Sequence, residues 1–418
     1  MSELDYQAAL DEMYAGYMAK RDRVAGLMDR DFKNPDVILS IARALNLTPA
    51  PARTIKITGS KGKGSTSRLI DFYLRRIAPS ANVALFVSPE ELEHTDRMKL
   101  NGRPIGEAEF VDIFRDLRPH LREAAGRLQG DAYLSPFGIF LLIALAWFAR
   151  RRADWHVLEI GRGGAHDEVG VLPAETAIIT SIFNEHANHL GPALADIAGE
   201  KAAIAATARR TIVSAQAADA LRRCGFAQEE AFLRENDAPL RPNLPLWLAI
   251  DDRLARQAIA SVLPVDDAAL LSFDVNGVST AWGSLQYLGV EVVFDALINL
   301  ESLDRAWFER TFAEKTLILF SLPDDKDRRR LAGFVEALPN AASAEIVLTG
   351  KRGYLSYEEA EKRPDRVCSR IRYDDAAAFR RVLTEQIARH TPSKIYCFGT
   401  HTYVRLVKSA LGPASTGA

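Results

Sequence analysis

Short runs of apolar and β-branched residues alternate with longer segments of helical period along the first half of the chain. Runs of this length predict strands, and apolar positions that recur every three or four residues predict helices. We predict strands at Thr54–Thr58, Val83–Val87, Trp155–Ile160, Ala177–Ile182 and Thr211–Ser214. Between them we predict helices at Ser65–Ile77, Glu107–Leu117, Pro136–Ala149 and Leu194–Ala206. This order is typical of a parallel sheet covered by helices.

The pattern weakens after Gln216 and resumes in the last third of the chain. Three prolines between residues 239 and 245 exclude a continuous helix or a central strand, so this stretch either links two lobes or edges a small sheet. The second series predicts strands at Val290–Phe294, Thr316–Phe320, Glu345–Thr349 and Lys394–Phe398. It predicts helices at Leu303–Phe312, Asp327–Leu338 and Ala376–Arg389.

Length supports a division into domains. One domain per about 100–200 residues gives two or three domains for a chain of 418 residues. We predict a larger α/β domain with a parallel sheet over residues 1–289 and a smaller, Rossmann-like α/β domain over residues 290–418.

Composition and charge limit the kinds of molecule that the protein is expected to bind. The 53 basic and 55 acidic residues are mixed along the chain and give a net charge of -2, so no field of one sign attracts nucleic acid or anionic lipid. Small-molecule partners are therefore expected, for a monomer or a weak homo-oligomer. The three cysteines are too few and too far apart for a disulfide framework or a CxxC metal site.

The chain shows no sequence feature of a membrane protein or an exported one. Its longest apolar stretch, Phe137–Phe148, is too short to cross a bilayer. Its first residues lack the apolar run of a signal peptide. We therefore expect a cytoplasmic location.

A glycine-rich segment, TIKITGSKGKGST, joins the first predicted strand to the first predicted helix. Glycines let the backbone turn sharply and present N–H groups to phosphate oxygens, and the helix start adds its positive end. The spacing differs from GxxxxGK[ST], because Gly64 separates Lys63 from Ser65. A glycine-rich surface turn beside a helix cap is the alternative, but the flanking strand and helix favour a nucleotide site. The candidate ATP-binding residues are Gly59, Ser60, Lys61, Gly62, Lys63, Gly64, Ser65 and Thr66.

Within this loop, Lys63 would reach the outer phosphates and the Ser65 hydroxyl would bind Mg²⁺. Two further predicted strands end in polar residues, Glu159 and His186. Parallel sheets hold their ligands at the carboxyl ends of the strands. Taken alone, His186 would be a loop or core histidine, Glu159 a paired or solvated carboxylate, and Lys201 a solvated lysine. Their combination with the loop predicts a magnesium site.

The order of these residues resembles the Mur ligase superfamily, and within it folylpolyglutamate synthase and dihydrofolate synthase most closely. The similarity spans nearly the whole chain. The segments that carry it are GSKGKGST, VSPEELEHTDRMKLNGRPI, EIGRGGAHD, TSIFNEHANHLGPALADIAGEKAAI, SLPDDKD and FGTHTYV.

This resemblance implies a P-loop ATPase domain followed by a Rossmann-like ligase domain. It implies that Ser65, Glu159 and His186 are magnesium ligands and that Lys201 is carbamylated to help hold a second magnesium. The implied reaction transfers a phosphoryl group from ATP to a substrate carboxylate, and an amine such as glutamate then attacks the acyl phosphate. Catalysis would consist mostly of positioning and charge neutralisation by Lys63 and the metals.

The second domain departs from the family pattern. The segment DALINLES keeps Asp295 and Asn299 as candidate nucleotide ligands, but Ile298 stands where the family has histidine. Ser284 stands where the family has arginine. Both lost groups face nucleotide in the family, so the contribution of this domain to ATP binding is predicted to be weakened or rebuilt.

The substrate side departs as well. Glu90 replaces a histidine, Gly138 replaces a glutamate that follows an aromatic residue, here Phe137, and Ala165 replaces an arginine. A carboxylate in place of a histidine changes the charge preference of a pocket, and losing a glutamate removes a hydrogen-bonding anchor. These departures argue against a pterin substrate.

Three classes of function follow. An active ATP-dependent amide ligase explains why the loop, the metal ligands and the lysine occur together. A non-catalytic homologue that binds nucleotide or a protein would explain Ile298 and Ser284. A P-loop kinase or GTPase is the third class, but the sequence has no separate base or guanine-reading motif, and the second domain would be unexplained.

Overall fold

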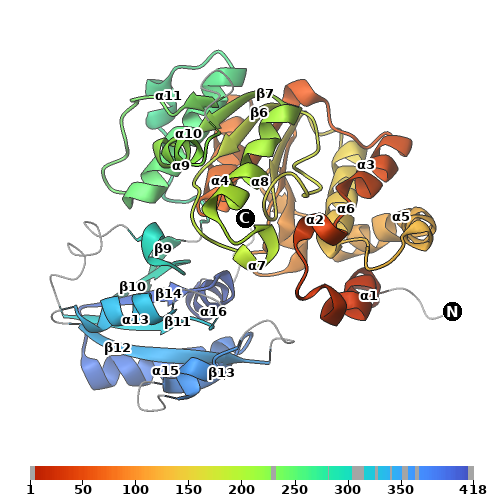
Figure 1. Cartoon of the computed structure of the whole chain (residues 1–418). Coiled ribbons are helices and arrows are strands. Elements are labelled where there is room, and N and C mark those ends of the chain that lie inside the picture. Colours follow the sequence, from red (N-terminus) through yellow and green to blue (C-terminus); the bar gives the residue numbers. More distant parts are fainter. Residues whose placement is uncertain are drawn as a thin grey trace. The chain divides into compact units, whose positions relative to one another are not determined.

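The computed structural model describes residues 5–226, 232–280, 282–303, 315–324, 328–338, 341–350, 356–362 and 367–412. Residue contacts divide the chain into two compact units (Figure 1). The first comprises Met1–Leu244 and Leu248–Val278, and the second comprises Pro245–Trp247 and Ser279–Ala418. Each unit is described by itself below.

The first unit is built on one large sheet. Among the described residues this sheet has eight strands in the order β4-β3-β2-β5-β1-β6-β7-β8. The strands are β1 Thr54–Thr58, β2 Val83–Phe86, β3 Met98–Leu100, β4 Arg103–Pro104, β5 Trp155–Glu159, β6 Ala174–Ile179, β7 Ala208–Val213 and β8 Phe232–Arg234. All pairings from β2 to β8 are parallel, and β3 and β4 form an antiparallel edge. Strand β1 is central, and all five of its residues are buried.

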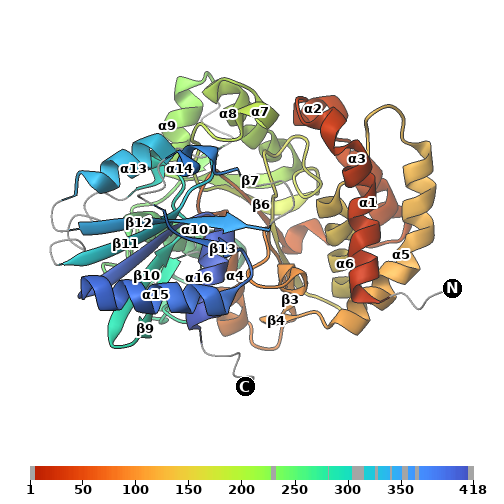
Figure 2. The same cartoon turned by 90° about the horizontal axis from the view of Figure 1, so that it is seen from below.

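Four helices lie side by side against one another in this unit (Figure 2). They are α1 Tyr6–Val24, α3 Pro35–Ala44, α5 Glu107–Arg127 and α6 Pro136–Arg150. Helix α6 is apolar around its whole circumference, and Gly138 to Phe148 are all buried. Such a helix is stable only when it is enclosed by protein. It lies between the sheet and the other three helices and shares their core with β2 and β5.

The remaining helices of this unit include α4, which follows β1 directly and contacts β1, β2 and β5. The others are short or lie toward β6, β7 and β8. Their bounds are α2 Asp29–Phe32, η1 Pro51–Arg53, α4 Lys63–Ile77, η2 His94–Arg97, α7 Ala187–Leu190, α8 Leu194–Ala202, η3 Ala203–Thr207, α9 Ala215–Arg223, α10 Leu246–Val262 and α11 Asp267–Leu271.

The second unit is a smaller sheet with helices on both faces. Among its described residues the strand order is β13-β12-β11-β14-β10-β9. The elements are β9 Trp282–Tyr287, β10 Val290–Asp295, η4 Leu300–Ser302, β11 Thr316–Ser321, α13 Arg328–Glu336, β12 Ala341–Thr349, α14 Glu358–Glu361, β13 Val367–Arg372, α15 Ala376–His390, β14 Lys394–Gly399 and α16 His401–Leu411.

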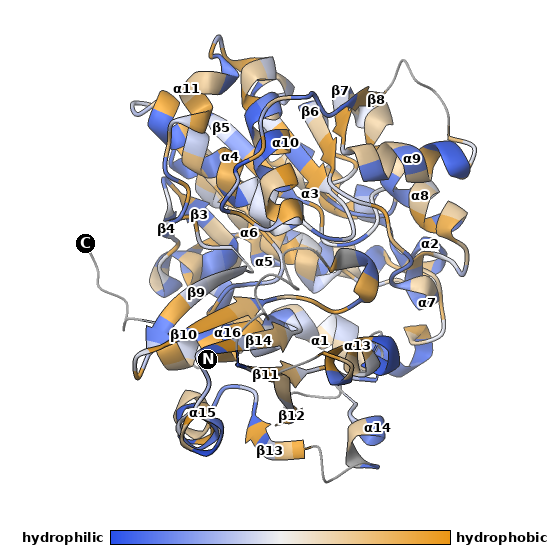
Figure 3. Ribbon diagram, turned by 90° about the vertical axis from the view of Figure 1, so that its left-hand side faces the viewer, coloured by the Kyte–Doolittle hydropathy of each residue, from blue (hydrophilic) through white to orange (hydrophobic). Residues whose placement is uncertain are grey.

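Alternate residues of its strands belong to two separate cores. On β10, Val292 and Phe294 pack with α15 and α16, whereas Val293 packs with α13. Strands with both faces covered are apolar throughout. Figure 3 accordingly shows β10, β11 and β14 in the hydrophobic colour.

The predicted alternating series is present in both units, with two differences. The predicted helix at Leu303–Phe312 lies almost entirely outside the described residues. The predicted domain boundary at residue 289 falls after β9, but β9 pairs with β10 in the second sheet. We therefore propose a boundary near residue 278.

The proline-containing stretch lies between β8 and α10 and forms no strand. No helix in the described ranges combines the length and apolar character needed to cross a membrane.

Candidate nucleotide and metal site

The glycine-rich loop leaves the central strand β1 at the carboxyl edge of the first sheet. Gly59 and Gly62 have φ angles of 151° and 96°, which favour glycine. A Cβ atom at Gly59 would lie 1.9 Å from Thr180 Oγ1, so no side chain fits there. The loop therefore needs glycine both for its turn and for its close approach to the end of β6.

Hydrogen bonds join this loop to the residues that follow β6. The Ser60 N–H donates to the Ser181 carbonyl at 2.8 Å, and the Lys61 N–H donates to Ser181 Oγ at 2.8 Å. The Phe183 N–H donates to Ser60 Oγ at 2.9 Å. Helix α4 begins at Lys63, and the N–H groups of a first helical turn have no acceptor within the helix. The loop is thus fixed from one side and presents the start of α4 to an anion.

Lys63 lies close to the loop backbone. Its Nζ donates to the Gly59 carbonyl at 2.7 Å. Its charge opposes the effect of burial on the pKa of two carboxyl groups, Glu159 and Glu185. The charge of Lys63 therefore affects the pKa of Glu159, the last residue of β5, and of Glu185, which lies in the segment after β6.

Glu159 is the last residue of β5 and is 2% exposed. Its Oε2 would lie 3.4 Å from a Cβ atom at Gly64, and it accepts the Ser88 N–H at 3.1 Å. Burial raises the pKa of Glu159, and Lys63 and Arg68 oppose this rise. Glu159 therefore lies beside the loop at Gly64, the residue that precedes the buried Ser65 in the chain.

Arg68 is a second cation beside the loop, one turn into α4, and the sequence did not single it out. Its Nη1 lies 2.6 Å from the position of a Cβ atom at Gly64. Its Nε is buried without a hydrogen-bond partner among the described residues. A guanidinium that keeps a free buried donor next to a phosphate loop is suited to a phosphate oxygen.

Glu185 joins His186 and Lys201 to the site, and the sequence interpretation missed it. Lys201 Nζ lies 3.2 Å from Glu185 Oε1, and His186 Nε2 lies 3.8 Å from Glu185 Oε2. Burial would raise the pKa of Glu185, but Lys201, Lys63 and His186 lower it overall. Glu185 directly precedes His186 in the sequence. A carboxylate next to the predicted histidine was therefore the signal that could have indicated Glu185 as a site residue.

Lys201 is 1% exposed, so it is not a solvated lysine. Burial lowers the pKa of Lys201, and Lys63 lowers it further, while Glu185 opposes both effects. The His186 side chain is 40% exposed, and His186 directly precedes α7 with a φ of 50°. Histidine is among the residues that adopt this left-handed conformation more readily than most.

Asp251 reaches the loop from α10, far away in the sequence. A Cβ atom at Gly62 would lie 2.2 Å from Asp251 Oδ1. Burial raises the pKa of Asp251 well above its usual range, and Lys61 opposes this. Nothing local in the sequence could have indicated this contact.

The first unit thus brings Ser65, Glu159 and Lys63 together at the loop, and His186 and Lys201 join through Glu185. Asp295 and Asn299 belong to the second unit, where Asp295 accepts the Tyr396 hydroxyl at 2.9 Å. Their nucleotide role stays a prediction. Within the described ranges, no three His, Cys, Asp or Glu side chains are grouped to hold a metal by themselves.

These residues fit Mg²⁺ and ATP. The loop N–H groups and Lys63 suit phosphates, and the hydroxyl of Ser65 and the carboxylate of Glu159 are the oxygen donors that Mg²⁺ prefers. Glu159 is buried near Lys63 and Arg68 but forms no ion pair with either within the described part of the chain, so its carboxylate can accept a cation.

On the substrate side, the carboxylate of Glu90 is neutralised within the chain. Arg97 Nη2 lies 2.6 Å from Glu90 Oε2, and His94 Nδ1 lies 3.5 Å from the same oxygen. Burial alone would raise the pKa of Glu90, but these partners hold it far below its usual range. Arg97 therefore balances the charge of Glu90, and the predicted change in the charge preference of the substrate pocket stays a prediction.

Comparisons with known proteins agree with this architecture. No family model matches the chain. *Mycobacterium tuberculosis* folylpolyglutamate synthase complexed with ADP and AMPPCP aligns with a TM-score of 0.74 and 22% identity, over 94% of this chain and 99% of that one. *Escherichia coli* FolC in complex with DHPP and ADP aligns with a TM-score of 0.70 and 21% identity, over 97% of each chain. The chain therefore has the two-domain α/β fold of these solved structures, as predicted.

Within this fold, its curated relatives are folylpolyglutamate and dihydrofolate synthases. The dihydrofolate synthase/folylpolyglutamate synthase of *Mycobacterium tuberculosis* is 30% identical over 193 residues, 44% of this chain and 39% of that protein. The *Escherichia coli* enzyme of the same name is 32% identical over 177 residues, 42% of this chain and 39% of that protein. The chain thus matches about two fifths of the length of these relatives. The predicted resemblance is confirmed.

Proposed function

We propose that the chain is an ATP-dependent amide ligase. It would activate a substrate carboxylate as an acyl phosphate for attack by an amine such as glutamate. The observation that carries this proposal is the position of Lys63 in the glycine-rich loop, where its Nζ donates to the Gly59 carbonyl at 2.7 Å. From there its charge opposes the effect of burial on the pKa of both Glu159 and Glu185. The solved relatives support it, since one folylpolyglutamate synthase/dihydrofolate synthase has Mn, AMPPNP and L-glutamate bound.

In this proposal, the loop N–H groups and Lys63 bind and orient the phosphates of ATP, and Arg68 adds a second cation. Ser65, Glu159 and His186 would hold Mg²⁺, which supplies neutralisation of phosphate charge when bound. Glu185 positions His186 and Lys201. Ser65, Glu159 and Lys201 are buried, and Lys63 is held by its hydrogen bond to Gly59, so these groups need little reorganisation during the reaction.

The proposed ligase reaction has two steps. A substrate carboxylate oxygen attacks the γ-phosphorus, the bond from that phosphorus to the β,γ-bridging oxygen breaks, and ADP leaves. The amine nitrogen then attacks the acyl carbon, the carbon–oxygen bond to phosphate breaks, and the amine loses a proton. The products are an amide, ADP and phosphate.

Lys201 is suited to carbamylation. Carbamylation requires the neutral amine, and burial lowers the pKa of Lys201. The nitrogen would attack the carbon of CO₂ and lose a proton, which leaves a carbamate anion. A carbamate beside Glu185 would place two anions together, so it would be stable only with a cation between them.

The second candidate function is a nucleotide-binding homologue without turnover. It is favoured by Ser284 and Ile298, which stand where the resemblance places an arginine and a histidine. Ser284 is exposed on β9, where it pairs with Val293. Asp295 and Asn299 would provide what remains of nucleotide binding by the second unit. In either case we place the protein in the cytoplasm, with small-molecule partners.

Phosphate release separates the two candidates. The purified chain would be supplied with ATP and Mg²⁺ and a panel of carboxylates, each with and without glutamate, and products would be identified by mass spectrometry. A ligase gives phosphate and an amide in equal amounts. ATP binding without phosphate release from any pair supports the non-catalytic role, and a phosphorylated product without an amide supports a kinase.

A further inference from the structure

A cavity of about 290 Å³ lies between helices α1 and α5 of the first unit. Figure 2 shows these two helices side by side. Residues 128–134, which lead from α5 into α6, contribute a third wall. The candidate nucleotide and metal residues are not among the described residues that line this cavity. It is therefore separate from the site of the proposed reaction.

Small residues open the cavity. Gly16 and Ala19 on α1 and Ala125 on α5 lie on the facing sides of the two helices and line it. A Cβ atom at Gly16 would meet only the Cβ atom of Tyr133, at a distance of 4.0 Å. A larger side chain at Gly16 would therefore fit in the space that is open here.

The floor of the cavity is apolar. It is formed by side chains that are at most 8% exposed, namely Met13, Phe114, Leu121, Leu134 and Ile139. Protein interiors are close-packed and contain few voids larger than a water molecule, so open space over an apolar floor is typical of a binding site. Small-molecule pockets measure about 300–1,000 Å³. This cavity lies at the lower end of that range, which suits a small molecule and not a helix of a partner protein.

Cations outnumber anions at the rim. The charged residues among the described lining are Glu12, Lys20, Arg118 and Arg122. Arg118 holds both oxygens of Glu12, with its Nε 2.9 Å from Oε1 and its Nη2 2.6 Å from Oε2. Arg122 makes a single contact with Glu12, at 3.2 Å, and its side chain is 63% exposed. Glu12 therefore balances Arg118, and the charge of Arg122 remains in excess.

Lys20 adds a second cation without a carboxylate partner. Its Nζ donates to the carbonyl groups of Gly130 and Ala132, and it forms no ion pair within the described ranges. These two bonds fix the wall of residues 128–134 to α1, and an ion pair of 3.2 Å between Arg23 and Asp131 does the same. The wall is therefore held in place while the charge of Lys20 stays unbalanced.

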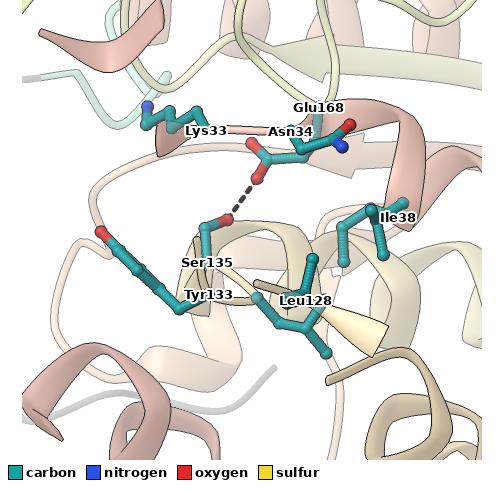
Figure 4. Close-up of a pocket in the computed structure, with 9 residues that line it drawn as sticks. Lys33, Asn34, Ile38, Leu128, Tyr133, Ser135 and Glu168 are labelled. Carbon is teal, nitrogen blue, oxygen red and sulfur yellow. Dashed lines mark hydrogen bonds between the residues drawn. The ribbon is translucent and has the colours of Figure 1, made fainter. Parts of the chain in front are cut away.

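A second cavity lies on the other side of this wall. Leu128, Tyr133 and Leu134 line both cavities. Figure 4 shows the second one, in which the Ser135 hydroxyl donates to Glu168. Its volume is about 10 Å³, which is room for one water molecule. A ligand would therefore be confined to the larger cavity between α1 and α5.

We propose that the cavity between α1 and α5 binds a small organic acid. The apolar body of the acid would cover the floor, and its carboxylate would lie beside Arg122, with the charge of Lys20 adding to the attraction. A guanidinium matches a carboxylate in both charge and hydrogen-bonding geometry. An alcohol or an amine of the same length would lack that match. This inference does not rest on the proposed ligase function.

Three probes with the same apolar chain test the charge preference of the cavity. Octanoate, octan-1-ol and octylamine would be titrated into the full chain without ATP, and binding would be followed by NMR. We expect octanoate to bind about fivefold or more tightly than octan-1-ol, because an ion pair is formed at a partly exposed site. Octylamine should bind most weakly. The preference for octanoate should decrease as NaCl is added, since salt screens exposed charges.

Variants locate the binding site. Arg122→Gln should reduce the preference for octanoate, and Lys20→Gln combined with Arg122→Gln should nearly abolish it. Gly16→Met should weaken octanoate and octan-1-ol alike, because the methionine side chain occupies the cavity. Arg127→Gln is the matched control, since Arg127 lies on the same helix, is 77% exposed and pairs with Glu123 outside the cavity. It should leave every affinity unchanged.

Three results would overturn the inference. They are equal affinities for octanoate and octan-1-ol, a preference that survives both charge substitutions, and octanoate binding that Gly16→Met does not weaken. Self-association that Gly16→Met abolishes, without octanoate binding to the wild type, would also overturn it, because the occupant would then be a second copy of the chain. If Gly16→Met fails to fold, the Arg122→Gln comparison decides, because that side chain is exposed. The assay uses neither ATP nor turnover, so its failure would leave the proposed ligase function standing.

Discussion

Replacing Glu185 with glutamine tests whether this residue balances the buried charge of the site. Glutamine keeps the size of the side chain but removes the negative charge that faces Lys201. Lys201 Nζ and Glu185 Oε1 are 3.2 Å apart, and their side chains are 1% and 11% exposed. At an effective dielectric constant of about 20, this separation corresponds to roughly 5 kcal/mol of attraction. Removing one partner of a buried pair generally costs about 3–5 kcal/mol.

We therefore expect Glu185→Gln to destabilise the first unit by about 3 kcal/mol at pH 7, or roughly 6–12 °C in its melting temperature. The measurement is calorimetric unfolding together with denaturation followed by circular dichroism. Glu123→Gln in the same unit is the matched control. Its carboxylate pairs with Arg127, whose side chain is 77% exposed, so about 1 kcal/mol or less is expected.

The dependence on pH gives the sharper test. Without Glu185, the pKa of Lys201 in the folded state falls further below that of the unfolded chain. The unfolded state then binds more protons, so the stability of the variant rises with pH up to the unfolded pKa of lysine, about 10.4. The difference from wild type should shrink between pH 7 and 10, and Lys201→Met should rescue Glu185→Gln. A defect that is absent, or that stays constant over this range, would refute the reasoning.

Three further predictions concern single residues. Lys63→Ala should lower phosphate release by about 10³-fold or more while the melting temperature stays nearly unchanged, because the lysine faces the loop; unchanged release would remove Lys63 from the mechanism. Arg68→Ala should weaken ATP binding in equilibrium titration by about tenfold, with partial recovery in Arg68→Lys; equal affinities would make Arg68 structural. His156 is buried and its pKa is lowered to about 4 by burial, so between pH 6.5 and 4 the unfolded state binds more protons and stability falls as pH falls. His156→Gln should remove roughly 3 kcal/mol of this acid sensitivity, measured as the difference between denaturation at pH 6.5 and pH 4.

Local features of the sequence predicted the parts of the site that depend on local structure. The loop could be predicted because a strand, three glycines and a helix follow one another directly. Glu159 could be predicted because it ends an apolar strand, and parallel strands place their ends at one edge. Asp251 could not be predicted, because its contact with the loop depends on packing between distant segments. A Cβ atom at Gly62 would lie 2.2 Å from Asp251 Oδ1, so only a glycine at this position leaves room for the contact.

The bounds of two elements differ from the predicted bounds where charged residues form ion pairs with other elements. Strand β7 begins at Ala208, three residues before the predicted start, because Arg210 pairs across the sheet with Glu175 on β6 at 3.0 Å. Helix α5 continues to Arg127 beyond the predicted end and past Pro119. Its polar second half is held by partners such as Glu12 on α1, which lies 2.6 Å from Arg118. The periodicity of hydrophobic residues gives no information about such ion pairs.

The charge balance of the site argues for a bound cation and not for phosphate binding alone. Lys63, Arg68 and Lys201 contribute three positive charges, and Glu159 and Glu185 contribute two negative charges, so these five side chains together carry at most one net positive charge. A lowered pKa of Lys201 reduces it further. A site that only had to hold a triphosphate would gain nothing from two buried carboxylates, which are costly to bury and repel phosphate. Both carboxylates become favourable once a divalent cation lies between them and the phosphates. We therefore expect nucleotide affinity to depend steeply on Mg²⁺, and ATP that binds equally well in EDTA would contradict this account of the site.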